Sequence, residues 1–374
     1  MRGIGRLRPV AVLVGLIAIA SAAASSLTPA AADEYSIAAL AFHPKSNALV
    51  LARGDGELRL VDFSDPAKPV VRGFGAKIGA AAFLSDGSGI VTGGEDGALR
   101  VWSLGGADAG APIHAGKEPI IGVAVSARGR FLAAVDRNLA LRIWQASDTG
   151  FRLAREIQLV RKFGSPGDTS RGDGRVPGVV WAESADVAFA PDESMVAVIT
   201  SFNNVYVSRI DGRAITVPRG SGDYESCCGV RILFTADGRF MIARRGAQPG
   251  YSAFVWTVRA GRLAGGREFP GLTQPREFAA LPNGAELLVA DGAGLRRVTA
   301  GTMVGADLLP AGPEEERFQH VAVSADGARI ATAELERVRK QDLPREVLVP
   351  VYEYRRSLVY RSRTGERLGQ ITLR

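Results

Sequence analysis

Cysteine and histidine are scarce in this chain, and common catalytic motifs are missing. Its 374 residues include two cysteines and three histidines. His43, His114 and His320 are far apart, without His-x-x-x-His spacing, so we expect them in turns and at the surface rather than around a metal. The sequence has no Cys-x-x-Cys-His motif, which excludes covalent haem attachment, and no Gly-x-Ser-x-Gly, Walker or His-Glu-x-x-His motif. We therefore predict no catalytic residue, no metal ligand set and no cofactor.

Long apolar runs are scarce as well. The run at 10–24 has about 15 residues, fewer than the roughly 20 that cross a bilayer. It follows Arg2, Arg6 and Arg8, and the alanines at 30–32 fit signal peptidase, so a cleaved Sec signal peptide over residues 1–32 is favoured over a retained anchor. No cysteine lies near the cleavage site, and paired arginines of the twin-arginine type are absent. We predict a periplasmic or secreted protein with no transmembrane segment after cleavage.

The charge is mildly basic and gives no sign of a nucleic-acid groove. Removal of Arg2, Arg6 and Arg8 with the signal peptide lowers the formal charge from +7 to +4. The basic residues are not interleaved with aromatic residues along one strand, as binding of single-stranded nucleic acid requires. We expect no nucleic-acid partner.

One pattern recurs seven times along the rest of the chain. A short apolar strand runs into a turn rich in Pro, Asp, Asn and Gly, and a second apolar strand and a third, alternating strand follow. The early copies repeat with a period of about 41 residues, the length of a four-stranded propeller blade. The sequence therefore predicts an all-β fold, a seven-bladed β-propeller of four-stranded antiparallel blades in a single domain over residues 33–374. The seven copies contain the segments 41–44, 82–87, 124–126, 187–192, 233–238, 279–284 and 321–327.

Two segments resemble known repeats. Residues 93–102 (Gly-Gly-Glu-Asp-Gly-Ala-Leu-Arg-Val-Trp) look like the end of a WD40 repeat, and residues 324–331 resemble the PD40-type repeat of periplasmic propellers. The resemblance covers most of the mature chain and implies a propeller; its motifs are specific for this architecture and not for a function. The usual Trp-Asp becomes Trp102-Ser103 and Trp144-Gln145, and the Gly-His dipeptide of WD40 blades is absent. We therefore do not expect the Asp-His-Ser/Thr-Trp network of that family in full.

The long insertions are predicted to share one face of the ring. Turns of an up-and-down blade alternate between two faces, and the segments 161–184, 218–228, 244–251 and 334–356 all fall in blade-to-blade connections or second-to-third turns. Long loops are often functional, although insertions are also tolerated as neutral decoration, because each doubling of loop length costs only about 0.6 kcal/mol. We predict that this loop-rich face binds another periplasmic protein or a small polar ligand. The predicted binding residues are Asp168, Arg171, Asp173, Arg219, Asp223, Tyr224, Glu225, Arg244, Arg245 and Tyr251.

The two cysteines, Cys227 and Cys228, are adjacent in the loop that leads to the fifth blade. Their α-carbons can be no more than about 3.8 Å apart, below the usual disulfide range of about 4.4–6.8 Å. A strained vicinal disulfide, free or intermolecular thiols, and metal binding all remain open.

An enzyme is the alternative to an interaction module. Propeller hydrolases and lactonases hold a cation at the mouth of the central channel with carboxylates and amides, and Glu183, Asp186 and Glu277 lie near such entrances. A calcium site needs about six to eight oxygen ligands, and this sequence offers fewer than half. A metal-dependent hydrolase or lactonase is therefore the second hypothesis.

Overall fold

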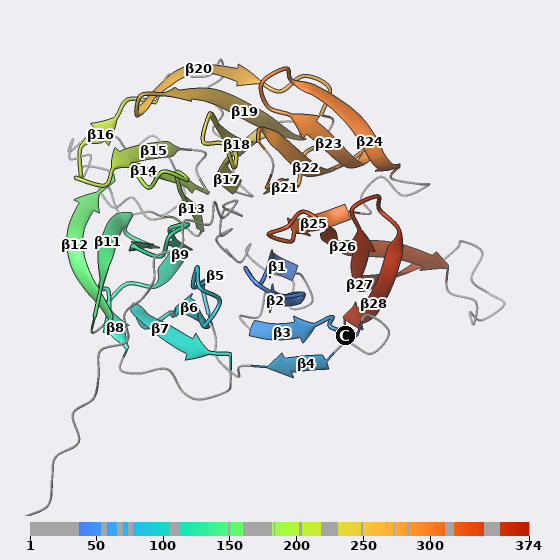
Figure 1. Ribbon diagram of the computed structural model, residues 1–374, viewed down its shortest axis with the longest axis horizontal. Coiled ribbons are helices and arrows are strands. Elements are labelled where there is room, and N and C mark those ends of the chain that lie inside the picture. Colours follow the sequence, from blue (N-terminus) through green and yellow to red (C-terminus); the bar gives the residue numbers. More distant parts are fainter. Residues whose placement is uncertain are drawn as a thin grey trace, which may run out of the picture.

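Seven four-stranded sheets stand around one axis in the computed structural model of the chain (Figure 1). In every sheet the strands are antiparallel and follow one another in sequence order, so each blade comes from one continuous stretch of chain. The fold class predicted from the repeats is confirmed. The structure describes residues 37–53, 58–65, 70–73, 78–104, 112–148, 150–159, 182, 184–201, 204–217, 231–247, 250–272, 274–282, 284–310, 318–339 and 352–373.

The first four blades take up the chain from Ile37 to Ile215. Their strands are β1 (Ile37–Phe42), β2 (Ala48–Arg53), β3 (Leu58–Asp62) and β4 (Val70–Gly73); β5 (Ala80–Phe83), β6 (Gly89–Gly93), β7 (Ala98–Ser103) and β8 (Ile113–His114); β9 (Ile120–Val125), β10 (Phe131–Asp136), β11 (Ala140–Ser147) and β12 (Gly150–Gln158); and β13 (Ala185–Phe189), β14 (Met195–Thr200), β15 (Val205–Arg209) and β16 (Ala214–Ile215).

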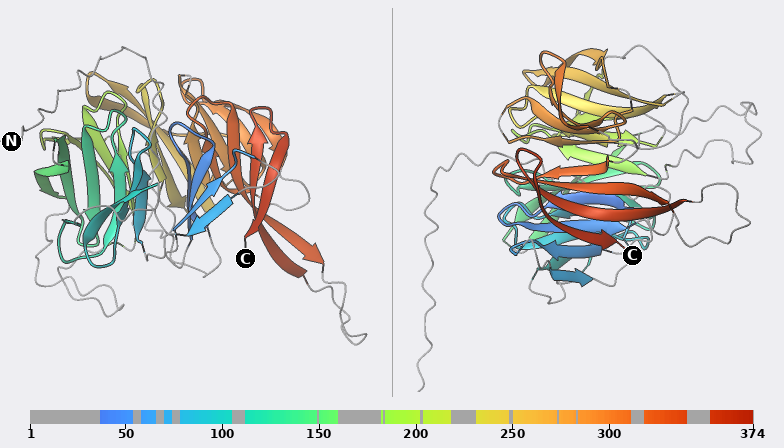
Figure 2. Two further views of the ribbon diagram at one scale, coloured as in Figure 1. Left: turned by 60° about the horizontal axis from the view of Figure 1, so that its bottom comes forward. Right: turned by 90° about the vertical axis from the view of Figure 1, so that its right-hand side faces the viewer.

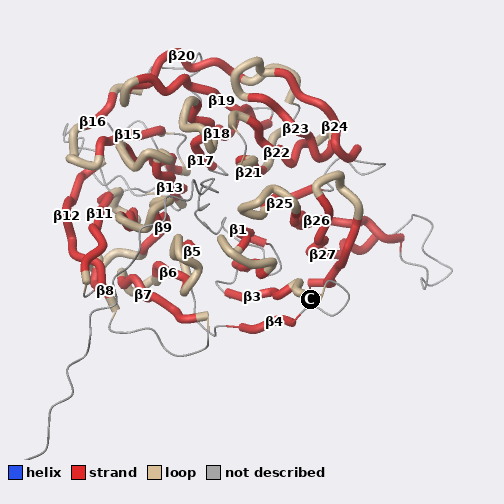
Figure 3. The backbone as a smooth tube through the Cα atoms, in the orientation of Figure 1, coloured by secondary structure: helices blue, strands red, loops and turns tan. Residues whose placement is uncertain are grey.

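The last three blades take up the chain from Arg231 to Leu373. Their strands are β17 (Arg231–Phe234), β18 (Phe240–Ala247), β19 (Gly250–Arg259) and β20 (Arg262–Glu268); β21 (Glu277–Ala280), β22 (Glu286–Asp291), β23 (Gly294–Thr299) and β24 (Val304–Pro310); and β25 (Phe318–Val323), β26 (Arg329–Arg339), β27 (Tyr352–Ser362) and β28 (Arg367–Leu373). The described residues contain strands and loops without a helix (Figure 3), so none of them forms a helix able to cross a bilayer.

The innermost strands are small and buried because neighbouring blades cover both of their faces. β9 and β13 are buried along their whole length. Just before β5, a Cβ atom on Gly79 would lie 2.2 Å from the carbonyl oxygen of Ile120 in the next blade, so only glycine fits there. This close approach is the physical reason for the glycine and alanines at the start of the blade 2 repeat.

The ring closes by side-chain packing between blades 1 and 7. β28 completes blade 7, and β1–β4 form blade 1 alone, so no strand is exchanged between them. One buried cluster contains Leu40, Phe42 and Phe63 of blade 1 together with Leu358 and Tyr360 of blade 7. The Phe63 and Tyr360 rings are stacked, with centroids 4.7 Å apart and planes 5° from parallel.

The first-to-second and third-to-fourth turns lie on one side of the ring, here called the turn face. On that face the Nε2 atom of His43 lies 2.8 Å from the carbonyl oxygen of Gly87 in the next blade. Glu193 accepts hydrogen bonds from the Arg128 amide and the Arg130 guanidinium of the preceding blade. Short turns thus link successive blades on this face.

The expected placement of the histidines is wrong for two of the three. His43 lies in a turn but is only 9% exposed, because its ring packs against Phe83 and bonds to Gly87. His320 lies on the innermost strand β25 and contacts Glu277. His114 is exposed, as expected.

Two of the predicted loops of the loop-rich face contain paired strand. Residues 244–247 and 250–251 belong to the β18–β19 hairpin, and residues 334–339 and 352–356 continue β26 and β27 as a ribbon that projects from the ring (Figure 2). The ribbon remains paired as far as Arg339 and Tyr352. The charged residues of these segments suit a loop as well as a strand, so the sequence alone did not distinguish the two.

Candidate functional site

At one level along the ring axis, the innermost strands of blades 1–3 carry a different type of residue from those of blades 4–7. This level lies four residues before the first-to-second turn, at the loop-rich end of each innermost strand, and strand register places its residues at equivalent positions. Small residues occupy it in three blades, whereas the other four blades carry ionisable side chains. The seven residues are Ala39, Ala80, Gly122, Asp186, Arg231, Glu277 and His320.

The four ionisable residues, here called the polar arc, contact one another in order from blade 4 to blade 7. Arg231 lies between two carboxylates: its Nη1 atom is 3.5 Å from Asp186 Oδ2, and its Nε atom is 2.5 Å from Glu277 Oε1. The other oxygen of Glu277 is 3.2 Å from His320 Nδ1. Asp186 and Glu277 are candidates from the sequence, whereas Arg231 and His320 are found in the structure. Counting back from each turn is the sequence signal that identifies all four.

Burial and the charge of Arg231 shift the pKa values of the Asp186 and Glu277 carboxyl groups in opposite directions. Asp186 is fully buried, and this desolvation outweighs Arg231 and the amide of Ile232 and raises the pKa of Asp186 to about 7. Burial also disfavours ionised Glu277, but Arg231, His320 and Arg244 outweigh it and lower the pKa of Glu277 to about 2. Arg231 approaches Glu277 more closely than Asp186, which accounts for the difference.

We expect Asp186 to make the fold less stable as pH rises from about 4 to about 7. Below about pH 4, Asp186 is protonated in both the folded and the unfolded protein. Between about pH 4 and pH 7 it is protonated in the folded protein only, and above about pH 7 it is ionised in both. The stability advantage of the wild type over Asp186→Asn, measured by denaturant unfolding, should therefore be smaller at pH 8 than at pH 5, by roughly 1 kcal/mol or more. Asp211→Asn, at an exposed turn position, controls for the loss of one carboxylate. An advantage that grows with pH would contradict this assignment.

The carboxylates suggested for a catalytic cation have other partners. Asp186 accepts hydrogen bonds from the amides of Val187 and Ile232, at 3.0 and 2.7 Å, and shares Arg231 with Glu277. A guanidinium between them opposes a cation electrostatically. Glu183, the third suggested ligand, lies outside the described residues, and those that are described include no group of three His, Cys, Asp or Glu side chains able to hold a metal.

Blade 5 carries two arginines on its second strand at the loop-rich end, where blades 3, 6 and 7 carry an acidic residue. Arg244 pairs with Arg231 across β17 and β18, and the matching second-strand residue is apolar in every other blade: Ala52, Gly93, Val135, Ile199, Ala290 and Ala333. The next position is acidic in blades 3, 6 and 7, with Asp136, Asp291 and Glu334, each near an arginine of the same blade. Blade 5 has Arg245 there, and blade 1 has Arg53.

The structure brings two of the predicted binding residues together. The Arg244 guanidinium lies over the Tyr251 ring, 4.9 Å from its centroid, and donates a hydrogen bond to the carbonyl oxygen of Arg276 in blade 6. Arg245 extends from the other side of the sheet, because side chains alternate along a strand, and lies 5.2 Å from the Phe254 ring. Arg276 joins this group without a sequence prediction, and its Nη1 atom donates to Gln319 Oε1 at 3.2 Å.

The other predicted residues cannot be placed. Asp168, Arg171, Asp173, Arg219, Asp223, Tyr224, Glu225, Cys227 and Cys228 lie outside the described residues, and so do residues 1–32. Their binding roles, the state of the two thiols and the signal peptide remain predictions.

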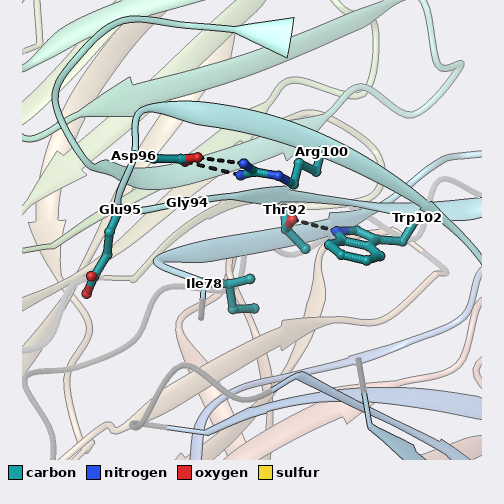
Figure 4. A pocket seen from close by; sticks show the side chains of 7 residues that line it. All are labelled: Ile78, Thr92, Gly94, Glu95, Asp96, Arg100 and Trp102. Atoms are coloured by element: carbon teal, nitrogen blue, oxygen red, sulfur yellow. Dashed lines mark hydrogen bonds and ion pairs between the residues drawn. The ribbon is translucent and has the colours of Figure 1, made fainter. Parts of the chain in front are cut away.

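A separate pocket of about 290 Å³ opens in blade 2 (Figure 4). Its lining includes Trp102, whose indole donates to the Thr92 hydroxyl at 2.8 Å, and Asp96, which binds Arg100 through both carboxylate oxygens. The Trp-Thr half of the WD40 network is therefore present in this blade, while the turn aspartate binds an arginine in place of the missing histidine. The sequence departures gave reason not to expect the whole network, and the structure shows which part of it blade 2 keeps.

The chain folds as a β-propeller, and one segment of it is similar to a WD40 repeat. Residues 69–103, which include β4, the outermost strand of blade 1, and the first three strands of blade 2, match the family described as WD domain, G-beta repeat. No curated protein matches the chain at a significant level. WD40 propellers typically bind proteins, so the fold suggests a role in protein interaction or as a scaffold.

Proposed function

We propose that the chain is a periplasmic or secreted interaction module that binds a partner protein through the loop-rich face over blades 4–7. The unequal distribution of polar residues carries this proposal. Packing in the ring requires only that each innermost strand fit against those of the neighbouring blades, and alanine or glycine does so in blades 1–3. Buried ion pairs are costly relative to apolar packing, so four ionisable residues in consecutive blades at one end of the axis favour a functional role.

The projecting ribbon of blade 7 also favours the loop-rich face as the binding surface. β26 continues past its pairing with β25, which ends at Glu334, and β27 extends beyond its pairing with β28, which begins at Arg356. The outer edges of the ribbon therefore present backbone groups that neither β25 nor β28 pairs. Such edges are natural sites for contact with another chain. The location rests on the predicted signal peptide over residues 1–32.

Photocrosslinking in the producing cell tests the proposal. A photoreactive amino acid at Glu336 or Arg355, both exposed on the ribbon, should crosslink a partner protein, whereas one at Arg213, 83% exposed on the turn face, should not. Fractionation and N-terminal sequencing of the same material should place the chain outside the cytoplasm, beginning at Asp33. Crosslinks from Arg213 alone, or none from any position, would contradict the proposed face.

A further inference from the structure

Six exposed arginines follow the outer rim of the turn face over blades 3–5. They lie on or beside β12, β16 and β20, the outermost strands of three consecutive blades (Figure 1). The segments that carry them, 147–155, 209–213 and 259–262, contain two carboxylates, Asp148 and Asp211, so the formal excess is four positive charges. The arginines, here called the arginine rim, are Arg152, Arg155, Arg209, Arg213, Arg259 and Arg262.

Contacts between blades make the arginine rim continuous. Arg155 of blade 3 donates a hydrogen bond from Nε to the carbonyl oxygen of Asp211 in blade 4, at 3.3 Å. A Cβ atom on Gly261 in blade 5 would lie 3.1 Å from the Nη1 atom of Arg209 in blade 4. The arginines of the three blades therefore form one stretch of positive surface.

The positive charge of the arginine rim is only partly neutralised. The Asp211 carboxylate lies 3.8 Å from Arg209 Nε and 3.7 Å from Arg213 Nε, so two arginines share one carboxylate. Ion pairs between side chains as exposed as these are weak, because water screens them. Arg259 and Arg262 flank the β19–β20 turn, and residues 259–262 contain no carboxylate.

The arginine rim is confined to one sector of the ring. The equivalent turn of blade 6, residues 299–304, has no ionisable residue, and the described part of that turn in blade 1 carries Asp62 and Asp65. Packing between blades does not require the arginines, because their side chains are exposed. Clustering of one sign of charge on exposed positions favours attraction of a polyanion.

The composition of the rim favours an anionic bilayer over the other polyanions. The described residues of its segments include no exposed aromatic side chain on which a base could stack. Their one large exposed hydrophobic side chain is Leu153, whereas the core of a protein interface is apolar. Guanidinium groups pair well with phosphate oxygens, and clusters of about four to eight basic residues bind anionic phospholipids.

We infer that the arginine rim binds the surface of a lipid bilayer through anionic phospholipid headgroups. The loop-rich face lies on the other side of the ring and stays open to a partner in this arrangement. The inference goes beyond the proposed function and does not depend on it, because binding to a bilayer requires no partner protein.

Cosedimentation of the purified chain with lipid vesicles tests the inference. Vesicles of phosphatidylcholine and phosphatidylglycerol in equal parts should bind the chain, more weakly as salt is raised. Vesicles of phosphatidylcholine alone should bind it much less, and they report any binding through the apolar run at 10–24, which does not depend on headgroup charge. The double variant Arg259→Gln/Arg262→Gln should lower the partition coefficient on the mixed vesicles about tenfold or more.

The matched control is Arg363→Gln/Arg367→Gln, which removes the same charge from the equivalent turn of blade 7. Both of these arginines are exposed, so neither double variant removes a buried contact. The control should bind the mixed vesicles as the wild type does. Equal binding to the two kinds of vesicle, no binding to either, or an equal affinity of the two double variants would overturn the inference.

A second measurement needs no variant and locates the bound surface. Phenylglyoxal modifies arginines, and the mixed vesicles should protect Arg213, Arg259 and Arg262 from it, as read by mass spectrometry, while Arg363 stays reactive. Equal modification with and without vesicles would overturn the site. A protein crosslink from Arg213 in the producing cell, without vesicle binding, would assign the arginine rim to a protein partner instead. Crosslinks from Glu336 test the partner of the loop-rich face separately.

Discussion

Replacing Glu334 with alanine is expected to destabilise the fold by about 3–5 kcal/mol, because it leaves the Arg361 charge buried without its counterion. Both side chains are 6% exposed. Arg361 binds Glu334 through Nη2 and Nε, and Thr332 donates to the same carboxylate oxygen at 2.6 Å. Denaturant unfolding of the wild type and Glu334→Ala measures the difference.

Two further variants separate the buried pair from surface electrostatics. Asp211 lies 3.8 Å from Arg209 with both side chains 46% exposed, so Asp211→Ala should cost less than about 1 kcal/mol. The double variant Glu334→Met/Arg361→Met should recover much of the loss, since apolar residues of similar length remove both charges. A Glu334→Ala protein as stable as the wild type would show that the pair contributes little. No recovery in the double variant would show that the loss does not come from the unpaired Arg361 charge.

The Glu334–Arg361 pair lies where blade 2 has the hydrogen bond between Trp102 and Thr92. Thr332 is the counterpart of Thr92, and Arg361 pairs with Ile330 as Trp102 pairs with Ile90 in blade 2. Blade 7 therefore fills the place of the Trp-Thr hydrogen bond with an Arg-Glu-Thr group. In blade 3, Ala134 stands at the threonine position and Trp144 is buried without that hydroxyl.

Most of the fold could be predicted from the sequence because each blade repeats a short local signal. The turns at Asp86-Gly87 and Asp326-Gly327 place glycine at positive φ, and alternating strands follow at fixed distances. Seven such signals define the blades and their faces. The end of each hairpin was harder to predict: β26 and β27 continue through charged residues that also suit a loop.

The candidate site was only half predictable, since its residues meet across blades. Asp186 and Arg231 are separated by the insertion at 218–228, and a single-blade pattern gives no indication that they touch. Arg244 and Tyr251 were predicted on the basis of loop composition, and the structure places them together for another reason, their positions on the paired strands β18 and β19. Counting back from each turn aligns the four positions of the polar arc, but it does not show that their side chains contact one another across blades.

Tyr360→Ala is expected to have a second large effect, because it weakens the one blade interface that joins the two ends of the ring. Tyr360 is 1% exposed, stacks on Phe63 and packs at 6.2 Å from Phe42. Removal of a buried aromatic ring costs about 3–5 kcal/mol. Among the residues that the structure describes, blades 1 and 7 share no strand, so side-chain packing is what opposes their separation.

Hydrogen exchange distinguishes opening of the interface between blades 1 and 7 from a general loss of stability. In Tyr360→Ala, exchange should rise first in β1, β2 and β27, which flank the interface, while β10 on the far side of the ring keeps its protection. Tyr360→Phe retains the stacked ring and should stay within about 1.5 kcal/mol of the wild type. If exchange rose equally in β10 and β1, the ring would be unfolding as one cooperative unit, and closure between blades 1 and 7 would not be its weakest interface.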